Sequence, residues 1–295
     1  MAKKPTRRMR SPIPWFGGKG MMAAKLLPLV PPHYAYCEPF GGGAAMLFAK
    51  EPAPVETYND IEGGLVNMFR VLRSPRKSRR FRALCALTAY SREEYAAAKE
   101  WATAPGDVQR AYMFFVCARQ SFAGRIGSAW GYARSTSTGG MAQVAGKWVN
   151  SIEGLPRVVE RVRRCQIDHD DFRRVIPRFD MPDAFHYCDP PYPLGTRKCA
   201  AYAYEMSDDD HRELIELLLH IEGMAMLSGY RCELHEPLEA AGWLRKDWQT
   251  VCHAAGKTRG SGLQGKGAAK KKVPRVESVW LCPRTQKALK KEGRL

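Results

Sequence analysis

Asp189-Pro190-Pro191-Tyr192 is the run of residues with the most specific chemistry in this sequence. It directly follows the apolar segment 185–188, and its two prolines stiffen the backbone. The Asp189 carboxylate and the Pro190 carbonyl can accept both N–H hydrogens of an amino group on an aromatic ring, and Tyr192 can stack on that ring. We therefore predict that Asp189, Pro190, Pro191 and Tyr192 are catalytic residues for the attack of such an amine on a methyl carbon.

A glycine turn at residues 38–43, with the sequence Glu-Pro-Phe-Gly-Gly-Gly, interrupts an earlier apolar segment. Glycines after a first strand let a ligand approach the backbone closely, and an acid about 20 residues further on can accept hydrogen bonds from ribose hydroxyls. Asp60 has this position. Because neither the dinucleotide fingerprint nor the Walker A pattern is present, the turn indicates a nucleoside cofactor rather than a phosphate site.

A third motif, Trp15-Phe16-Gly17-Gly18-Lys19, combines aromatic rings, a glycine turn and a cation. Beside a cofactor, Trp15 can cover an adenine ring and Lys19 can bind a carboxylate. Such a turn is also compatible with an ordinary surface loop.

The formal net charge of +17 makes a polyanion the expected partner, because contacts with phosphates release condensed counterions. The charge is concentrated in three runs without an acidic residue, at residues 3–10, 73–82 and 257–275. We expect these runs to be mobile or to lie on an anionic surface. A role in solubility alone is the competing interpretation.

The nine cysteines show no C-x-x-C pair and no zinc spacing, so we expect no metal and a reduced, cytoplasmic environment. There is no signal-peptide pattern and no apolar run long enough to cross a bilayer. We therefore expect no membrane association.

Strands alternate with helices in the outer parts of the chain. The predicted strands are 34–37, 55–58, 185–188 and 224–227, and a helix capped by Ser207 runs from Asp208 to about Ile221. This alternation predicts a mostly parallel sheet, with ligands bound beyond the carboxyl ends of its strands.

The middle of the chain, residues 62–154, has helical periodicity instead. Leu65 to Leu72 keep helical spacing, Ser91 with Glu94 has the form of a capping box, and Asp107 begins a further helix. We predict a helical insertion here, between two parts of one catalytic domain at 1–61 and 155–295.

Together these motifs closely resemble the Dam-type (D12 class) DNA adenine N6-methyltransferases. The resemblance covers nearly the whole chain, and the motifs occur in the family's order. They are residues 15–19, 38–44, 59–61, 189–192, 227–230 (Leu-Ser-Gly-Tyr) and 277–280 (Glu-Ser-Val-Trp).

The resemblance implies a Rossmann-like α/β methyltransferase domain that binds S-adenosylmethionine, with an inserted helical DNA-recognition domain. It implies methyl transfer to N6 of a flipped-out adenine in double-stranded DNA, with no metal, by a protein that is monomeric in solution. A solitary, a phage-encoded and a restriction-modification role are all compatible with the resemblance. The resemblance and the motifs above together assign eight residues to the cofactor: Trp15, Lys19, Glu38, Phe40, Gly42, Asp60, Asp171 and Asp189. The expected DNA-binding residues, partly chosen from loop position and charge, are Arg119, Phe122, Arg125, Arg134 and Lys147.

Two residues depart from the family pattern beside the expected cofactor pocket. Ala44 replaces the third glycine of the turn, and Glu62 replaces the usual Asn. A cytosine-N4 DNA methyltransferase and a non-catalytic basic DNA-binding protein with the same fold are the alternatives. Asp rather than Ser at position 189 favours adenine as the target.

Overall fold

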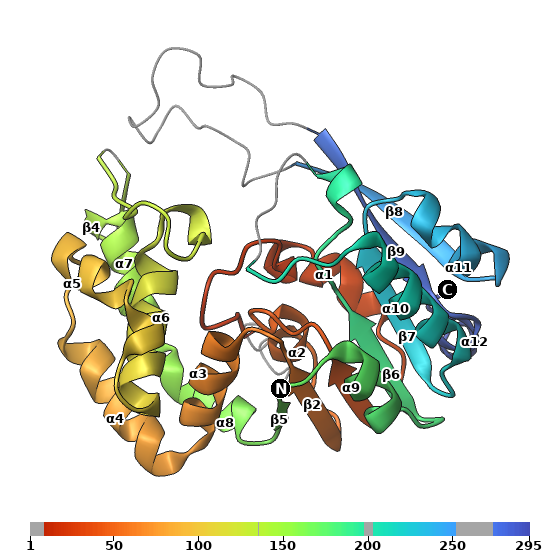
Figure 1. The fold of residues 1–295 in the computed structure, drawn as a ribbon, viewed down its shortest axis with the longest axis horizontal. Helices are drawn as coiled ribbons and strands as arrows, with labels where there is room; N and C mark the ends of the chain where they lie inside the picture. Colours follow the sequence, from red (N-terminus) through yellow and green to blue (C-terminus); the bar gives the residue numbers. More distant parts are fainter. Residues whose placement is uncertain (1–8, 135, 198–202, 252–273) are drawn as a thin grey trace, which may run out of the picture.

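The computed structural model describes residues 9–134, 136–197, 203–251 and 274–295. Its main feature is a seven-stranded sheet with the order β5-β2-β1-β6-β7-β9-β8 (Figure 1). The first five strands are parallel, and β9 is antiparallel to both of its neighbours. The strands are β1 Ala35–Glu38, β2 Val55–Asn59, β5 Gln166–Asp168, β6 Ala184–Cys188, β7 Met224–Gly229, β8 Leu244–Val251 and β9 Pro274–Leu281.

The central strands are buried throughout. Every residue of β1, β6 and β7 is buried, as expected for parallel strands covered on both faces. The four strands predicted from apolar runs are confirmed as β1, β2, β6 and β7 to within about two residues at each end.

Helices cover both faces of the sheet. Figure 1 shows α9, α10 and α11 side by side in front of it. Arg294, three residues beyond the end of α12, donates a hydrogen bond to the carbonyl of Pro28 within η2. The predicted cap of α10 is confirmed, because Ser207 and Asp210 form a capping box. These helices are α1 Ala23–Leu26, α2 Ala45–Ala49, α9 Phe172–Phe179, α10 Asp208–His220, α11 Glu236–Ala240 and α12 Pro283–Lys291, with short 3-10 turns η1 Lys19–Met21, η2 Leu27–Leu29, η5 Leu194–Thr196 and η6 Glu233–His235.

Six helices lie between β2 and β5 in the chain and gather on one side of the sheet (Figure 1). Ser91 caps α5 by accepting from the N–H of Glu93, so the cap is confirmed, but the expected capping box with Glu94 is not formed. The helix predicted to begin at Asp107 is also confirmed. The group comprises α3 Gly63–Arg73, α4 Pro75–Leu87, α5 Arg92–Ala98, α6 Asp107–Gln120, α7 Gln143–Glu153 and α8 Leu155–Val162, with η3 Trp101–Thr103, η4 Phe122–Gly124 and the small hairpin β3 Ser137–Thr138 and β4 Met141–Ala142.

The basic run 73–82 forms most of helix α4. Ser74 caps this helix, while Phe81 and Cys85 bury its apolar side. The charges therefore lie on the exposed face of an ordered helix, a case the charge pattern alone did not predict. Residues 3–8 and 257–273 of the other two basic runs lie outside the described residues.

A buried ion cluster joins the helical group to the sheet. Glu56 of β2 accepts hydrogen bonds from Lys50 Nζ at 2.5 Å and from Arg161 Nη2 of α8 at 2.7 Å. Arg161 also donates to the carbonyl of Leu47 at 2.9 Å. Because the Glu56 side chain is 0% exposed, the position of α8 against β2 is fixed by charges that have no access to water.

Candidate active site

The glycine turn after β1 is fastened to the end of β2. Gly41 N–H donates to the Asn59 carbonyl at 2.8 Å, and the Tyr58 hydroxyl donates to the Gly42 carbonyl at 2.8 Å. The Asp60 carboxylate accepts from the N–H of Gly42 at 2.6 Å. Three successive residues of the second strand end thus hold the turn after the first.

Asn59 extends this network to the next loop. The side-chain NH2 group of Asn59 donates to the main-chain carbonyls of Pro39 and Asp170, and its side-chain oxygen Oδ1 accepts from the Asp170 N–H. Asp171 then caps α9 by accepting from the N–H of Arg173 at 2.9 Å. The turns after β1, β2 and β5 therefore form one hydrogen-bonded edge.

Two residues of the turn have left-handed backbone conformations. Gly42 has φ 49°, and a Cβ there would lie 2.7 Å from Cδ1 of Trp15, so only glycine lets the Trp15 ring lie directly against the turn. Ala44 has φ 56° and is the only non-glycine residue with positive φ among the described residues. The departure from the family's third glycine thus falls at a position that glycine would occupy with less strain.

Asp189 lies just beyond β6 in a cluster of charged groups. Its Oδ1 is 2.6 Å from Nζ of Lys19, which also donates to the Gly17 carbonyl at 3.0 Å. Lys19 Nζ is 3.5 Å from Oε1 of Glu277 on β9. Burial raises the pKa of Asp189 above its ordinary value, and the Lys19 ammonium opposes this shift.

Tyr192 is turned away from the position expected of a base-stacking residue. Its hydroxyl donates to Glu277, its ring packs edge-on against Tyr230 with centroids 4.8 Å apart, and the Lys19 ammonium lies 4.7 Å from the ring centroid. Tyr192 is only 8% exposed and is not part of the cavity wall described below. Its contacts include Lys19, Glu277 and Tyr230, because the Asp-Pro-Pro-Tyr turn directs the ring toward β9.

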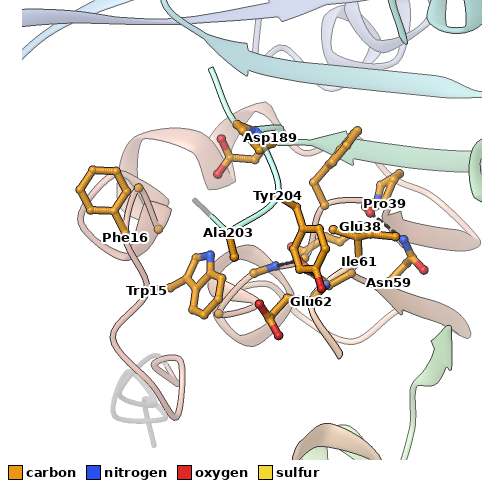
Figure 2. A pocket seen from close by; sticks show the side chains of 18 of the residues that line it. Trp15, Phe16, Glu38, Pro39, Asn59, Ile61, Glu62, Asp189, Ala203 and Tyr204 are labelled. Carbon is orange, nitrogen blue, oxygen red and sulfur yellow. Dashed lines mark hydrogen bonds between the residues drawn. The ribbon is translucent and has the colours of Figure 1, made fainter. Parts of the chain in front are cut away.

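A cavity of about 630 Å³ opens at the carboxyl ends of the strands. All eight residues predicted to bind the cofactor line it: Trp15, Lys19, Glu38, Phe40, Gly42, Asp60, Asp171 and Asp189. Of the predicted catalytic residues, Asp189 and Pro191 line it, whereas Pro190 and Tyr192 do not. In Figure 2, Trp15 and Phe16 lie on one side of this space and Ile61, Glu62 and Tyr204 on the other.

Besides Asp189, two further cavity carboxylates have raised pKa values. Burial raises the pKa of Glu38 to about 8, although its Oε1 accepts hydrogen bonds from the Tyr36 hydroxyl and the Leu47 N–H. Its Oε2 is buried without a hydrogen-bond partner among the described residues. Burial also raises the pKa of Asp60 to about 6, against the N–H groups of Glu62 and Gly42.

The residues predicted to bind DNA are dispersed over the helical group. Arg125 alone among them lines the cavity, with its guanidinium 5.2 Å from the centroid of Phe16. Phe122 is 39% exposed on η4, and Arg134 and Lys147 are exposed. Arg119 is different, because burial beside Phe115 lowers the pKa of its guanidinium to about 10.

Several residues of the cavity were not anticipated. Trp101 and Phe114 come from the helical group and pack edge to face with centroids 4.9 Å apart. Tyr187 reaches the cavity from inside β6, and its hydroxyl is 3.0 Å from Oγ of Ser228 on β7. Tyr204 is 51% exposed there. Only the alternation of side chains along β6 gave a sequence signal, for Tyr187; the others depend on tertiary packing.

No group of three or more His, Cys, Asp or Glu residues suited to a metal ion occurs within the described ranges. None of the helices in that part of the chain has the length and apolar character needed to cross a membrane.

The parallel sheet with one reversed strand, and a cavity at its carboxyl edge, define an α/β protein whose fold is consistent with a methyltransferase. Residues 15–251 match the family model of the D12 class N6 adenine-specific DNA methyltransferases. The match covers most of the chain, which therefore belongs to this family of enzymes. A comparison with curated proteins found no match.

Proposed function

We propose that this protein transfers the methyl group of S-adenosylmethionine to N6 of an adenine flipped out of duplex DNA. The observation that carries the proposal is the shared cavity. Asp189, the glycine turn, Asp60 and Trp15 all line the same space. Family membership supplies the reaction type and the target base.

The charge of the cavity fits a cationic donor. The protein as a whole is strongly basic, yet eight acidic side chains line the cavity against three cationic ones. The acidic residues are Glu38, Asp60, Glu62, Asp170, Asp171, Asp189, Glu205 and Asp210, and the cations are Lys19, Arg125 and Arg173. A nucleoside triphosphate would be repelled by such a wall, whereas a sulfonium with an amino group is attracted.

The residues of the cavity wall support the following roles in binding S-adenosylmethionine. Trp15 covers the adenine ring of S-adenosylmethionine, and Asp60 accepts hydrogen bonds from its ribose hydroxyls. Glu38 Oε2, which has no hydrogen-bond partner among the described residues, accepts a further hydrogen of the cofactor. When bound, S-adenosylmethionine supplies a methyl carbon activated by a positively charged sulfur.

Asp189 acts on the target amine together with the Pro190 carbonyl, which must turn toward the cavity for this role, because Pro190 does not line it in this structure. The lone pair of adenine N6 is delocalised into the ring, and two acceptors for its hydrogens favour the tetrahedral nitrogen that can attack. The carboxylate also stabilises the positive charge that develops on N6, and fixed acceptors of this kind need no reorganisation during the reaction. Holding the amine in line contributes further through proximity.

Duplex DNA is the substrate form that the charge supports. The target N6 is stacked inside the helix, so the base must leave the stack to reach Asp189, at a cost of about a few kcal/mol. Phosphate contacts by exposed cations such as Arg134 and Lys147 offset this cost. We assign residues 62–154 as the target-recognition part, with Arg125 nearest to the cavity.

Two measurements test the proposal. Duplex DNA incubated with the protein and tritiated S-adenosylmethionine, then digested to nucleosides, should yield N6-methyladenine rather than N4-methylcytosine. Asp189→Ala should lower the rate by a factor equivalent to about 3 kcal/mol, by analogy with deleted oxyanion contacts. Asp209→Ala on the exposed surface of α10 should match the wild type. Full activity of Asp189→Ala would refute the role of this carboxylate.

A further inference from the structure

Glu277 belongs to the family motif 277–280, to which the proposed function gives no role. It lies on β9, where it pairs with Trp248 of β8, and its side chain is only 11% exposed. Its Oε1 accepts the Tyr192 hydroxyl hydrogen and lies 3.5 Å from Lys19 Nζ. Glu277 is therefore a second carboxylate beside the ammonium that binds Asp189.

The contact between Lys19 and Asp189 conflicts with the proposed role of Asp189 as a hydrogen-bond acceptor for the target amine. Its Oδ1 already accepts from Lys19 at 2.6 Å, and the ammonium neutralises its charge. An amine that donates a hydrogen bond to Asp189 Oδ1 must use lone pairs that Lys19 already occupies. The positive charge that develops on the amine is also better stabilised by a carboxylate that has no cation paired with it. Lys19 must therefore weaken its contact with Asp189 when the target amine binds.

Lys19 cannot simply be released, because its side chain is 7% exposed and an unpaired buried cation is strongly unfavourable. Glu277 offers the alternative partner. A distance of 3.5 Å against 2.6 Å means that a small side-chain rotation exchanges one carboxylate for the other. The Tyr192 hydroxyl holds the Glu277 carboxylate in position for this exchange.

We propose that Glu277 is a positioning residue that receives the Lys19 ammonium as the target amine engages Asp189. The inference rests on the proposed function, because it presumes that Asp189 accepts hydrogens from that amine. The exchange is non-covalent and leaves every proton where it was. It makes Asp189 Oδ1 available and restores its full negative charge at the moment when the amine nitrogen becomes positive.

Glu277→Gln is the informative variant, since it keeps the side-chain shape and an acceptor for Tyr192 but removes the charge. Single-turnover methyl transfer at saturating donor and DNA should fall by at least about tenfold, in line with the loss of a preorganised electrostatic group. The Kd for S-adenosylmethionine, measured by calorimetry, should stay within about twofold of the wild type, since Lys19 keeps its ion pair with Asp189 in the resting site. Glu277→Asp should recover part of the rate, because it restores the charge.

Glu236→Gln is the matched control, because this glutamate is exposed on α11 and outside the cavity. It should transfer methyl groups at the wild-type rate. A wild-type rate for Glu277→Gln would overturn the inference, as would a loss explained entirely by weaker donor binding.

A crystal structure of the wild-type protein with target DNA and S-adenosylhomocysteine gives a second test that needs no variant. Lys19 Nζ should lie within hydrogen-bond distance of Glu277 and beyond it from Asp189. An unchanged bond between Lys19 and Asp189 would overturn the inference. A wild-type protein that methylates no adenine contradicts the proposed function instead, and that assay is read before any variant is compared.

Discussion

At the scale of single residues, Glu38 and Asp60 are carboxyl groups whose ionisation is disfavoured by their burial in the cavity wall. With a pKa of about 8, Glu38 is mostly protonated at neutral pH, and one of its oxygens has no partner among the described residues. A cation bound beside it lowers its pKa, because opposite charges favour the ionised form. Binding of a cationic donor is therefore coupled to loss of a proton.

This coupling predicts proton release when S-adenosylmethionine binds at pH 7. Calorimetry in buffers with different ionisation enthalpies should report a net release, because a cation bound beside Glu38 lowers its pKa from about 8 and so favours the ionised carboxylate. Glu38→Gln should abolish most of the release. S-adenosylhomocysteine, which lacks the sulfonium charge, should release fewer protons, and equal release for the two ligands would contradict the role given to Glu38.

Gly42 gives a steric prediction. In Gly42→Ala the new methyl group would meet the Trp15 ring at 2.7 Å, so the ring must move and the affinity for S-adenosylmethionine should fall by about tenfold or more, the loss of about 1.4 kcal/mol of contact. Gly139→Ala is the control, since Gly139 also has positive φ but has open space around it. Both variants introduce backbone strain, and only the first should weaken donor binding in equilibrium titrations.

At the scale of elements, the ion cluster around Glu56 predicts where stability is concentrated. Glu56→Gln would leave Lys50 and Arg161 as buried cations without their anion, which should lower the free energy of unfolding by about 3 kcal/mol in urea titrations. Although burial raises the pKa of Glu56, hydrogen bonds and charge from Arg161 and Lys50 bring it below its usual value of 4.5. The stabilisation is therefore present above that value and is lost as the pH falls through the lower pKa of the folded state.

Glu216→Gln on the surface of α10 provides the comparison. Its side chain is 71% exposed beside His220, and exposed ion pairs contribute about 1 kcal/mol at most. Similar losses in Glu56→Gln and Glu216→Gln would show that the cluster between β2 and α8 does not fix the helical group.

Elements with a strong local signal were predictable, and those defined by tertiary contacts were not. The buried strands β1, β2, β6 and β7 are short apolar runs, and α10 carries its own capping box. By contrast, β8 contains three consecutive charged residues, Arg245, Lys246 and Asp247, because it lies at the edge of the sheet, and β9 beside it contains Arg275 and Glu277. Helix α4 was hidden because its cations dominate its composition while only a few residues face the core.

The same distinction holds within the site. Residues in sequence motifs, such as Asp60 and Asp189, are brought together because carboxyl ends of parallel strands meet at one edge. The ion contact of Glu277 with Lys19 joins residues more than 250 positions apart, and no spacing rule connects them. The direction of the Tyr192 ring likewise depends on β9, a strand that the sequence did not predict.

At the scale of the whole molecule, the exposed cations predict strong salt dependence of DNA binding. Arg134→Gln should weaken binding to all duplex sequences alike and reduce the slope of log Kobs against log salt by about 1, as expected for loss of one phosphate contact. Arg125→Gln should instead lower the rate of methyl transfer to bound DNA, because Arg125 lines the cavity against Phe16. Filter binding across salt concentrations and single-turnover assays separate the two, and identical behaviour would contradict the positions assigned to them.

The contrast between a basic exterior and an acid-lined cavity also sorts the parts of one DNA strand. Phosphates are attracted to the outside of the protein and repelled from the cavity floor, whereas an uncharged nucleobase meets no such opposition. In the proposed reaction a nucleotide would therefore enter base first, and electrostatic repulsion of its own backbone would limit how deep it goes. Insertion depth, and with it the distance between N6 and the proposed donor, would then depend on charge as well as on shape.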